Sequence, residues 1–451
     1  MKKRHLLLVL FSLLGWTQIR ADVEIIATNF PDENFRSYLL SQDYGSDELI
    51  TDEEIATIYT ISVANKGIQS LEGIKFFTAL KELDCGGNQL TALDVSKNTA
   101  LTGLSCVYNQ LTALDVSKNT ALTCLSCVYN QLTTLNVSGC TALEVLSCEY
   151  NQLTALDVSG CTALRWLWCE YNQLTALDVS GFTALKWLYC EHNQLTTLNV
   201  SGCTALETLF CYSNQLTALD VSGFTALTWL SCNNNQLTKL DVSGCTALER
   251  LLCRNSQLTA LNVSECTALG ELLCSNNQLT TLDVSKNTKL WVLDCSINRL
   301  TTLDVSKNTA LIALGCDGNQ LISLNVSKNT ALIALSCCQN QIKGAAMDAL
   351  VSSLRTQSDA YLYVIYNENE GNVMTTTQVA AAKTKGWTPE YYDGTDWKEY
   401  AGSDPTAIES IESDASASKN GSDVYFDLSG RRVMTPQKGI YVKNGKKVVV
   451  K

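Results

Sequence analysis

The sequence predicts a repeat solenoid, in which short parallel β-strands stack into one long sheet. A 21-residue unit, first complete as LTALDVSKNTALTGLSCVYNQ at 90–110, recurs without insertion through Gln341. Within it, Leu104 and Cys106 alternate with small or polar residues, which is the period of a strand with one buried face. Proline is absent between residues 32 and 388, as an unbroken ladder of strand hydrogen bonds requires. One unit cannot bury its apolar face alone, so we expect the units to stack.

Thirteen units are present when a looser one at 68–89 is counted, and together they occupy residues 68–341. Each follows the framework L-x-x-L-x-C-x-x-N-x-L, as in Leu101, Leu104, Cys106, Asn109 and Leu111. This framework resembles the leucine-rich repeat, with cysteine in place of the third leucine. The 21-residue cysteine variant is similar to the internalin J-like family of bacterial surface proteins. The resemblance implies parallel strands on a concave face that binds partners.

Asparagine occupies the turn position in twelve of the thirteen units, and Ser256 is the exception. A stack of buried asparagine side chains can satisfy the backbone groups that each turn leaves unpaired. The other fixed positions carry leucine, valine or alanine, which we interpret as interior packing residues.

Thirteen of the twenty cysteines lie 21 residues apart, from Cys85 to Cys337. In an exported chain, disulfides would be the usual interpretation. Coils stack about 4.8 Å apart, so a bond between neighbours is within reach. However, thirteen cysteines cannot all pair, and parallel side chains suit the disulfide dihedral poorly. We therefore predict free thiols that pack as small apolar groups. A second set interchanges with phenylalanine and asparagine and reads as buried filler: Cys140, Cys161, Cys203, Cys245 and Cys266.

The first 21 residues have the layout of a secretory signal peptide. Basic residues at 2–4 precede an apolar run at 6–14 that is too short to cross a membrane, and Ala21 is a plausible cleavage point. No other stretch approaches 18 apolar residues, so no transmembrane helix is expected. Cleavage would leave 29 basic against 45 acidic residues, a net charge of −16. Such a charge repels phosphate backbones, so nucleic acid is not an expected partner.

Residues 22–67 are predicted to form a helical N-terminal cap, with helices near Phe30–Leu40 and Ile55–Ile61. Between them, Asp43, Asp47 and Glu54 have spacings that resemble an EF-hand loop, and internalin caps resemble truncated EF-hands. Gly45 and Glu48 stand where that loop needs an oxygen ligand and a glycine. We expect a structural cap without calcium, and the three acidic residues are a weak candidate metal site. No other cofactor is expected.

Residues 342–401 are predicted to form a small α/β unit that caps the last coil. It has helices at about 345–354 and 376–385 and a strand at 361–366. Residues 402–422, which are rich in Ser, Ala and Asp, read as a flexible linker.

Residues 423–451 contain three strand-like runs, and Asn444-Gly445 is a strong hairpin signal. The last 21 residues carry seven basic groups and no acidic one. This tail resembles the C-terminal sorting domains of the type IX secretion system in its D-L-S-G-R-x-V and K-G-x-Y runs. The resemblance implies export to the surface of a Gram-negative bacterium, with attachment to the outer membrane through the tail. The alternative is a small β-domain unrelated to export.

Function must lie where the repeats differ from one another, at the outward strand positions. Many of these positions hold aromatic residues, and exposed aromatic patches mark binding sites. The predicted ligand-binding strip in coils five to eight comprises Trp166, Trp168, Tyr171, Trp187, Tyr189, His192, Phe210, Tyr212 and Trp229.

These features favour an adhesin that grips a protein or cell-surface ligand, for adhesion, host interaction or biofilm. The alternative is a glycan-binding surface protein that uses the same strip, and a passive coat protein is a further one. Enzymatic activity is not expected, because His192 is the only histidine after the predicted signal peptide. Glu170 and Glu191 could mimic a catalytic carboxylate pair, but an open arc is expected to offer nothing that raises a carboxyl pKa.

Overall fold

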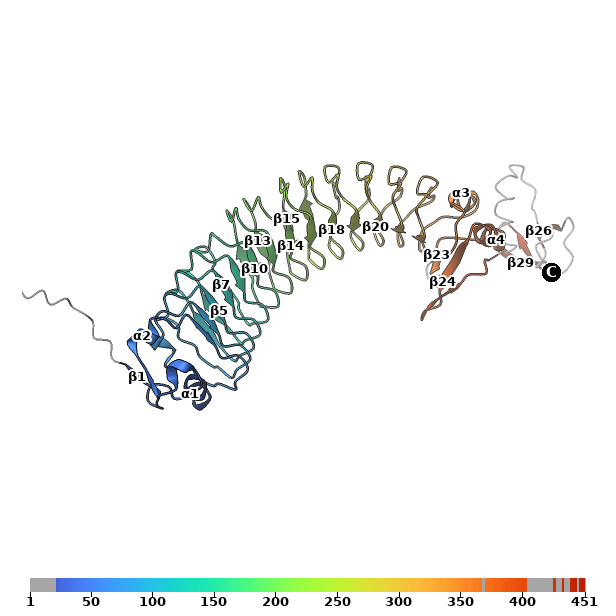
Figure 1. Ribbon diagram of the computed structural model, residues 1–451. Coiled ribbons are helices and arrows are strands. Elements are labelled where there is room, and N and C mark those ends of the chain that lie inside the picture. Colours follow the sequence, from blue (N-terminus) through green and yellow to red (C-terminus); the bar gives the residue numbers. More distant parts are fainter. Residues whose placement is uncertain are drawn as a thin grey trace, which may run out of the picture. The chain divides into compact units, whose positions relative to one another are not determined.

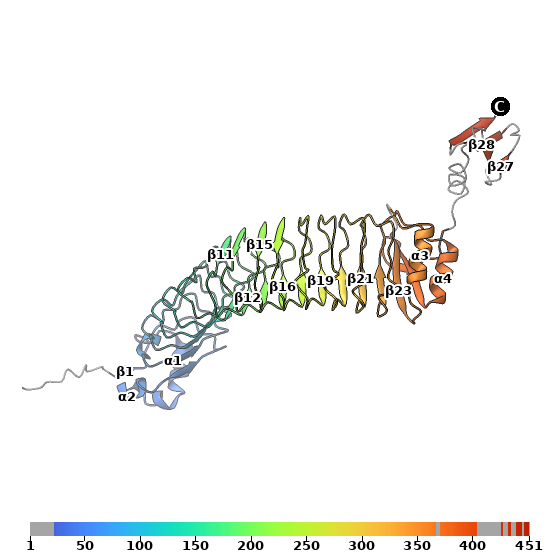
Figure 2. The same ribbon diagram turned by 90° about the horizontal axis from the view of Figure 1, so that it is seen from above.

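The computed structural model describes residues 22–366 and 370–403, and the backbone of four short strands between residues 425 and 450. The predicted signal peptide lies outside the described residues, as does the predicted linker from residue 404 on. The chain divides into two units, of which the first ends at Leu195 and the second begins at Thr196. Each unit contains a run of stacked coils (Figures 1 and 2).

Short helices and a two-stranded antiparallel sheet cover the first coil of unit 1. Asp32 caps the first helix by accepting a hydrogen bond from the Phe35 N–H at 2.9 Å. Its second carboxylate oxygen accepts from the Gln69 N–H at 2.8 Å, which ties the helix to the first coil. The elements are β1 (Val23–Glu24), α1 (Glu33–Leu40), the 3₁₀ turn η1 (Asp43–Gly45), β2 (Leu49–Ile50) and α2 (Asp52–Ile55).

The prediction of a helix over Ile55–Ile61 is wrong. Thr51 and Glu54 form a reciprocal capping box that starts α2 at Asp52, and the helix ends after one turn. The chain then extends into β3 (Thr60–Ser62), which pairs in parallel with β4 (Glu82–Asp84). Pairing with the first coil therefore overrides the local helical pattern.

In unit 1, each coil adds a three-residue strand to one parallel sheet, and neighbouring strands pair in register. Other short strands lie on the opposite side of the coils (Figure 2). After β4 the sheet contains β5 (Gly103–Ser105), β7 (Cys124–Ser126), β9 (Val145–Ser147), β10 (Trp166–Trp168) and β12 (Trp187–Tyr189). The remaining elements are η2 (Ile74–Phe76), β6 (Ala113–Asp115), β8 (Thr134–Asn136) and β11 (Ala176–Asp178).

Unit 2 repeats the same arrangement, and its parallel sheet continues past the last coil into β23 and β24. The sheet contains β14 (Thr208–Phe210), β16 (Trp229–Ser231), β18 (Arg250–Leu252), β19 (Glu271–Leu273), β20 (Val292–Asp294), β21 (Ala313–Gly315), β22 (Ala334–Ser336), β23 (Ala360–Tyr366), β24 (Trp387–Tyr392) and the antiparallel β25 (Trp397–Glu399). The other elements are β13 (Thr197–Asn199), β15 (Ala218–Asp220), β17 (Lys239–Asp241), α3 (Ala345–Ser353) and α4 (Thr376–Thr384).

The described strands of the tail form an antiparallel sheet in the order β27-β26-β28-β29. Lys443 and Lys446 pair on either side of the predicted Asn444-Gly445 turn. The bounds are β26 (Tyr425–Phe426), β27 (Arg432–Val433), β28 (Gly439–Lys443) and β29 (Lys446–Val450).

The interior of the coils consists of leucine, valine and cysteine side chains. The thirteen cysteines in 21-residue register are fully buried. Several of their thiols donate to the backbone carbonyl of the next coil, as Cys85 does to Ser105 O at 3.3 Å and Cys316 does to Ser336 O. Burial raises the pKa of Cys106 to about 12, so the thiol form is favoured. The cysteines thus pack as the small apolar groups that the register predicts.

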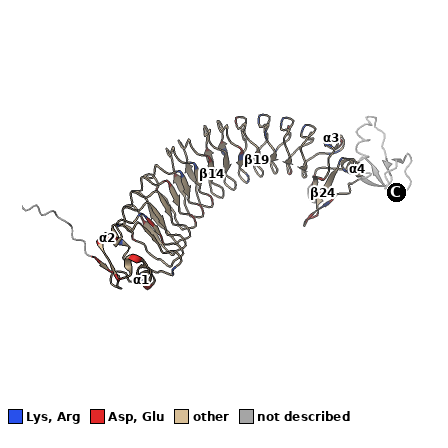
Figure 3. Cartoon of the chain, viewed as in Figure 1, with Lys and Arg blue, Asp and Glu red and all other residues tan. Residues whose placement is uncertain are grey.

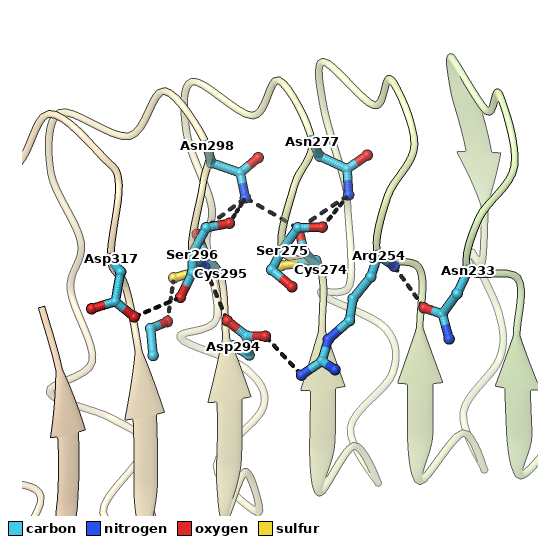
Figure 4. Close-up of polar contacts among 11 residues, drawn as sticks. Asn233, Arg254, Cys274, Ser275, Asn277, Asp294, Cys295, Ser296, Asn298 and Asp317 are labelled. Carbon is cyan, nitrogen blue, oxygen red and sulfur yellow. Dashed lines mark hydrogen bonds and ion pairs between the residues drawn. The ribbon is translucent and has the colours of Figure 1, made fainter. Parts of the chain in front are cut away.

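The turn asparagines bind backbone groups of neighbouring coils. Figure 4 shows Asn277 and Asn298 on adjacent coils of unit 2. Asn277 Nδ2 donates to the carbonyls of Cys253 at 2.9 Å and Cys274 at 3.1 Å, and its Oδ1 accepts from Leu258 N at 3.0 Å. One side chain therefore satisfies backbone groups of three chain segments, as the sequence predicts. Ser256 interrupts the ladder, and its buried hydroxyl has no hydrogen-bond partner.

Candidate binding surface

The solvent-facing side of the parallel sheet, here called the sheet face, carries a cluster of large rings in unit 1. Trp166 and Trp168 alternate along β10 with the buried Leu167. The register pairs Trp166 with Trp187 and Trp168 with Tyr189. Both pairs meet edge to face, with ring centroids 6.3 and 6.4 Å apart. These four rings form the aromatic cluster of unit 1, and Trp187 is its most open member, with 38% of its surface exposed.

Tyr171 and His192 do not lie among these strand residues. They belong to a ring ladder at the turn that follows the sheet. Neighbouring rings of this ladder stack nearly parallel, with centroids 4.3–4.6 Å apart and interplanar angles of 9–14°. Its members are Tyr108, Tyr129, Tyr150, Tyr171 and His192.

All five members of the ring ladder have a positive φ, between 52° and 55°. This left-handed conformation costs a side chain with a Cβ about 1 kcal/mol or more. Unit 2 fills the same turn position of three coils with asparagine, which tolerates the conformation, and Asn255 Nδ2 donates to Asn234 Oδ1 at 2.7 Å. Ser213, Ile297 and Gln339 have a positive φ at the same position, so the strain belongs to the repeat turn, and the run of rings is what distinguishes unit 1.

The ring ladder exposes the edges of its rings, because each inner ring has a neighbour on both faces. Tyr108, at the end of the stack, is 60% exposed. Burial and hydrogen bonds with Tyr129 and Tyr171 together raise the pKa of Tyr150 to about 12, so the hydroxyl groups also face one another. The ladder thus offers hydroxyl groups and ring edges to a partner.

The remaining predicted strip residues lie in unit 2. The Phe210 ring meets Trp229 edge to face, with centroids 4.9 Å apart, and lies tilted to Tyr212 at 6.4 Å. The Arg250 guanidinium lies over the Trp229 ring at 4.8 Å, and Arg250 also pairs with Glu271 at 3.6 Å. This arginine was not among the predicted site residues. It covers Trp229 and makes this part of the sheet face less open.

Farther along unit 2, the sheet face is polar (Figure 4). Arg254 Nη2 reaches across one coil to Asp294 Oδ2 at 2.7 Å. Asp317 accepts hydrogen bonds from Ser296 and Ser336, at 3.1 and 2.5 Å. Burial raises the pKa of the Asp317 carboxyl although these hydrogen bonds lower it. The network holds adjacent coils together.

A second apolar row lies in unit 2, outside the predicted ligand-binding strip. The row consists of Trp291, Ile312 and Ile333, which directly precede β20, β21 and β22, and of Tyr361 in β23, and 40–47% of each is exposed. Backbone hydrogen bonds join these residues, as from Ile312 N to Trp291 O at 2.9 Å. The detectable signal was two isoleucines at a repeat position that holds polar residues in most other coils.

The expectation that nothing raises a carboxyl pKa on this surface is wrong. Burial, together with the neighbouring Glu149 and Glu191, raises the pKa of Glu170 to about 8. These carboxyl groups lie on adjacent coils of one sheet face. In a glycosidase, the two carboxyl groups lie on either side of the scissile bond, whereas these groups are neighbours on one surface. The raised pKa is therefore not evidence of a catalytic pair.

Acidic residues are frequent in the segments of α1 and α2, where the weak calcium candidate lies (Figure 3). Glu54 accepts hydrogen bonds from the backbone and hydroxyl of Thr51, and Asp47 accepts one from Leu49 N. In the described ranges, no group of three or more His, Cys, Asp or Glu residues is arranged to hold a metal ion. The capping box is thus the observed role of Glu54.

A search of the described segments finds no helix that is both long and apolar enough to cross a membrane.

Comparison with known proteins identifies the family. No family model matches the chain. A stretch of 71 residues is 37% identical to internalin J of Listeria monocytogenes, and it covers 16% of this chain and 8% of that protein. The functional domain of InlJ from L. monocytogenes, which includes a cysteine ladder, is 35% identical in sequence and has a TM-score of 0.58. This match covers 77% of this chain and 82% of that one.

Two further structures share the fold. A leucine-rich-repeat protein of Leptospira interrogans is 25% identical with a TM-score of 0.57, over 73% of this chain and 89% of that one. An internalin (inlF) of L. monocytogenes is 23% identical with a TM-score of 0.53, over 77% of this chain and 98% of that one. With its 21-residue cysteine units and its match to the InlJ domain, the chain belongs to the internalin J-like leucine-rich-repeat proteins.

Proposed function

We propose that this protein is an internalin-like adhesin that binds a protein on another cell surface through its sheet face. The observation that carries the proposal is the aromatic cluster of unit 1, with the ring ladder beside it. Trp166, Trp168 and Trp187 add nothing to the buried interior, and large rings held at a solvent-facing surface are typical of binding hot spots. The proposed uses are adhesion, host interaction or biofilm formation.

A glycan ligand remains the second candidate, because tryptophan and tyrosine next to glutamate also suit sugars. The geometry of the ring ladder favours a protein. A sugar ring stacks on an aromatic face, and the faces of the inner ladder rings are occupied by their neighbours. Exposed ring edges and hydroxyl groups instead suit peptide groups and side chains.

The two ligand classes separate in one experiment. Labelled mature protein, residues 22–451, is applied to an array of cell-surface ectodomains and to an array of purified glycans. We expect saturable binding to an ectodomain, and competition by unlabelled protein. Binding that survives only on glycans, or that disappears when ectodomains are deglycosylated, would overturn the protein-binding proposal.

We also propose that the tail directs export through the type IX system and attaches the protein to the outer membrane. The support is the basic charge of the last 21 residues and their resemblance to sorting domains. Deletion of residues 409–451 in the native bacterium should leave the protein in the periplasm, protected from protease added to whole cells. Normal surface digestion of the truncated chain would contradict this role.

A further inference from the structure

In three consecutive coils of unit 1, a glutamate directly follows the buried cysteine of the 21-residue register: Glu149, Glu170 and Glu191. The strands before them pair in register, and Tyr150 N and Tyr171 N donate to the carbonyls of Glu170 and Glu191, both at 3.1 Å. Neighbouring coils in such a stack are about 4.8 Å apart. The three carboxyl groups, here called the glutamate row, are therefore stacked on one another.

The glutamate row is shielded from water. Oε2 of Glu149 and Oε2 of Glu170 are buried and have no hydrogen-bond partner. The Glu191 side chain is 6% exposed. Arg165, a cation of the same coils, pairs with Glu144 at 3.3 Å. Burial and repulsion between neighbours both destabilise the ionised form of carboxyl groups in such a row.

The charged groups that act on Glu170 have the same sign. Burial is the largest cause that raises its pKa to about 8, and the charges of Glu149 and Glu191 account for part of the same shift. Burial also raises the pKa of Glu149 and of the Tyr189 phenol, which faces Glu191 and Glu170. The other titratable groups around the row are the thiols beneath it and the ladder rings that follow it in the chain: Cys148, Cys169, Cys190, Tyr150, Tyr171 and His192.

We propose that the glutamate row is a pH-sensitive switch in the sheet face of unit 1. At mildly acidic pH the Glu170 carboxyl keeps its proton and packs between Glu149 and Glu191. At alkaline pH Glu170 ionises, its neighbours repel it, and coils four to six loosen. The inference stands on the stacking and burial of the three carboxyl groups, and it does not depend on the identity of any ligand.

The sign of the pH dependence follows from linkage. An unfolded glutamate has a pKa of about 4.3. Because the folded pKa is higher, the folded state holds the proton more tightly than the unfolded state. Stability is therefore highest below the unfolded pKa, declines as pH rises, and has lost this contribution completely above the folded pKa of about 8.

The test is hydrogen–deuterium exchange of the full mature chain at about pH 5 and about pH 8, the two ends of this range. The readout is protection of peptides from 148–172, compared at each pH between the natural protein and Glu170→Gln. Glutamine has the shape of the protonated acid and cannot ionise. As the pH rises, the protection of these peptides in the natural protein should fall, relative to this variant, by up to about tenfold per pH unit. This is an upper limit, because part of Glu170 contacts solvent.

Glu144→Gln is the matched control, because Glu144 belongs to the same repeats but is half exposed and paired with Arg165. It should show the same pH trend as the natural protein. Equal trends in the natural protein and Glu170→Gln would overturn the proposal. If Glu170→Gln does not fold, a carbon-13 titration of the Glu170 carboxyl in the natural protein decides. A midpoint near the unfolded value of about 4.3 excludes the switch.

Discussion

Replacing Asn277 by alanine is expected to lower the free energy of unfolding by about 3 kcal/mol. The substitution removes two donors to the buried carbonyls of Cys253 and Cys274, and the acceptor of the Leu258 N–H. Buried backbone groups that lose their partners cost about 1–3 kcal/mol each. Because stability in a solenoid is a sum over coils and their interfaces, the change should appear as an earlier transition in urea.

The adjacent coil offers the opposite change. Ser256 occupies the turn position between Asn235 and Asn277, and its hydroxyl has no partner. Ser256→Asn should restore the donors of the ladder and raise the free energy of unfolding by about 1 kcal/mol or more. Gln257→Ala, on the same coil and exposed, is the control and should change it little. If Asn277→Ala and Gln257→Ala have equal effects, the buried asparagines do not stabilise the fold.

The coil architecture could be predicted because each of its rules appears in every unit. The position of Cys106 in one unit predicts that of twelve other buried thiols, and the turn asparagine, Asn109 in that unit, predicts the hydrogen bonds of the turn. Because the pattern is repeated, it can be recognised even where one unit departs from it. A motif that occurs once has no such support. The capping box of Thr51 and Glu54 is one example, and there the predicted helix was wrong.

Most of the unpredicted features depend on contacts between coils. Tyr171 reads as one more outward residue, yet a positive φ turns it onto Tyr150 and away from the strand positions of Trp166 and Trp168. Glu170 reads as a solvated carboxylate, but stacking buries it between like charges. Alternation along one strand determines which residues face outward. It does not determine how outward side chains of neighbouring coils cover each other.

Inward residues of each strand form the packed interior and outward residues form the surface, so the surface can vary while the fold is kept. Leu167 and Cys169 are fully buried, whereas Trp166 and Trp168, which alternate with them along the chain, are partly exposed. A change at an outward position therefore leaves the packed interior intact. The ring ladder is the exception, because its backbone is strained and each ring supports the next.

The double change Trp166→Ala, Trp187→Ala is expected to weaken ligand binding about a hundredfold. Truncation of a hot-spot aromatic costs about 2 kcal/mol or more, and about 1.4 kcal/mol corresponds to a factor of ten in Kd. The two rings contact each other, so the double change removes the aromatic pair as a whole. Binding is measured as Kd against the ectodomain captured from the array, and circular dichroism checks that the variant is folded.

Trp291→Ala is the matched control, because Trp291 is exposed to nearly the same extent as Trp187, 40% against 38%, but lies in the second apolar row. Ser105→Ala, on the sheet face of unit 1 outside the aromatic cluster, is the second control. Both should bind as the natural protein does. A folded double variant with unchanged Kd would exclude the aromatic cluster of unit 1 as the site. Weakened binding in Trp291→Ala alone would instead assign the site to the row of Trp291, Ile312 and Ile333.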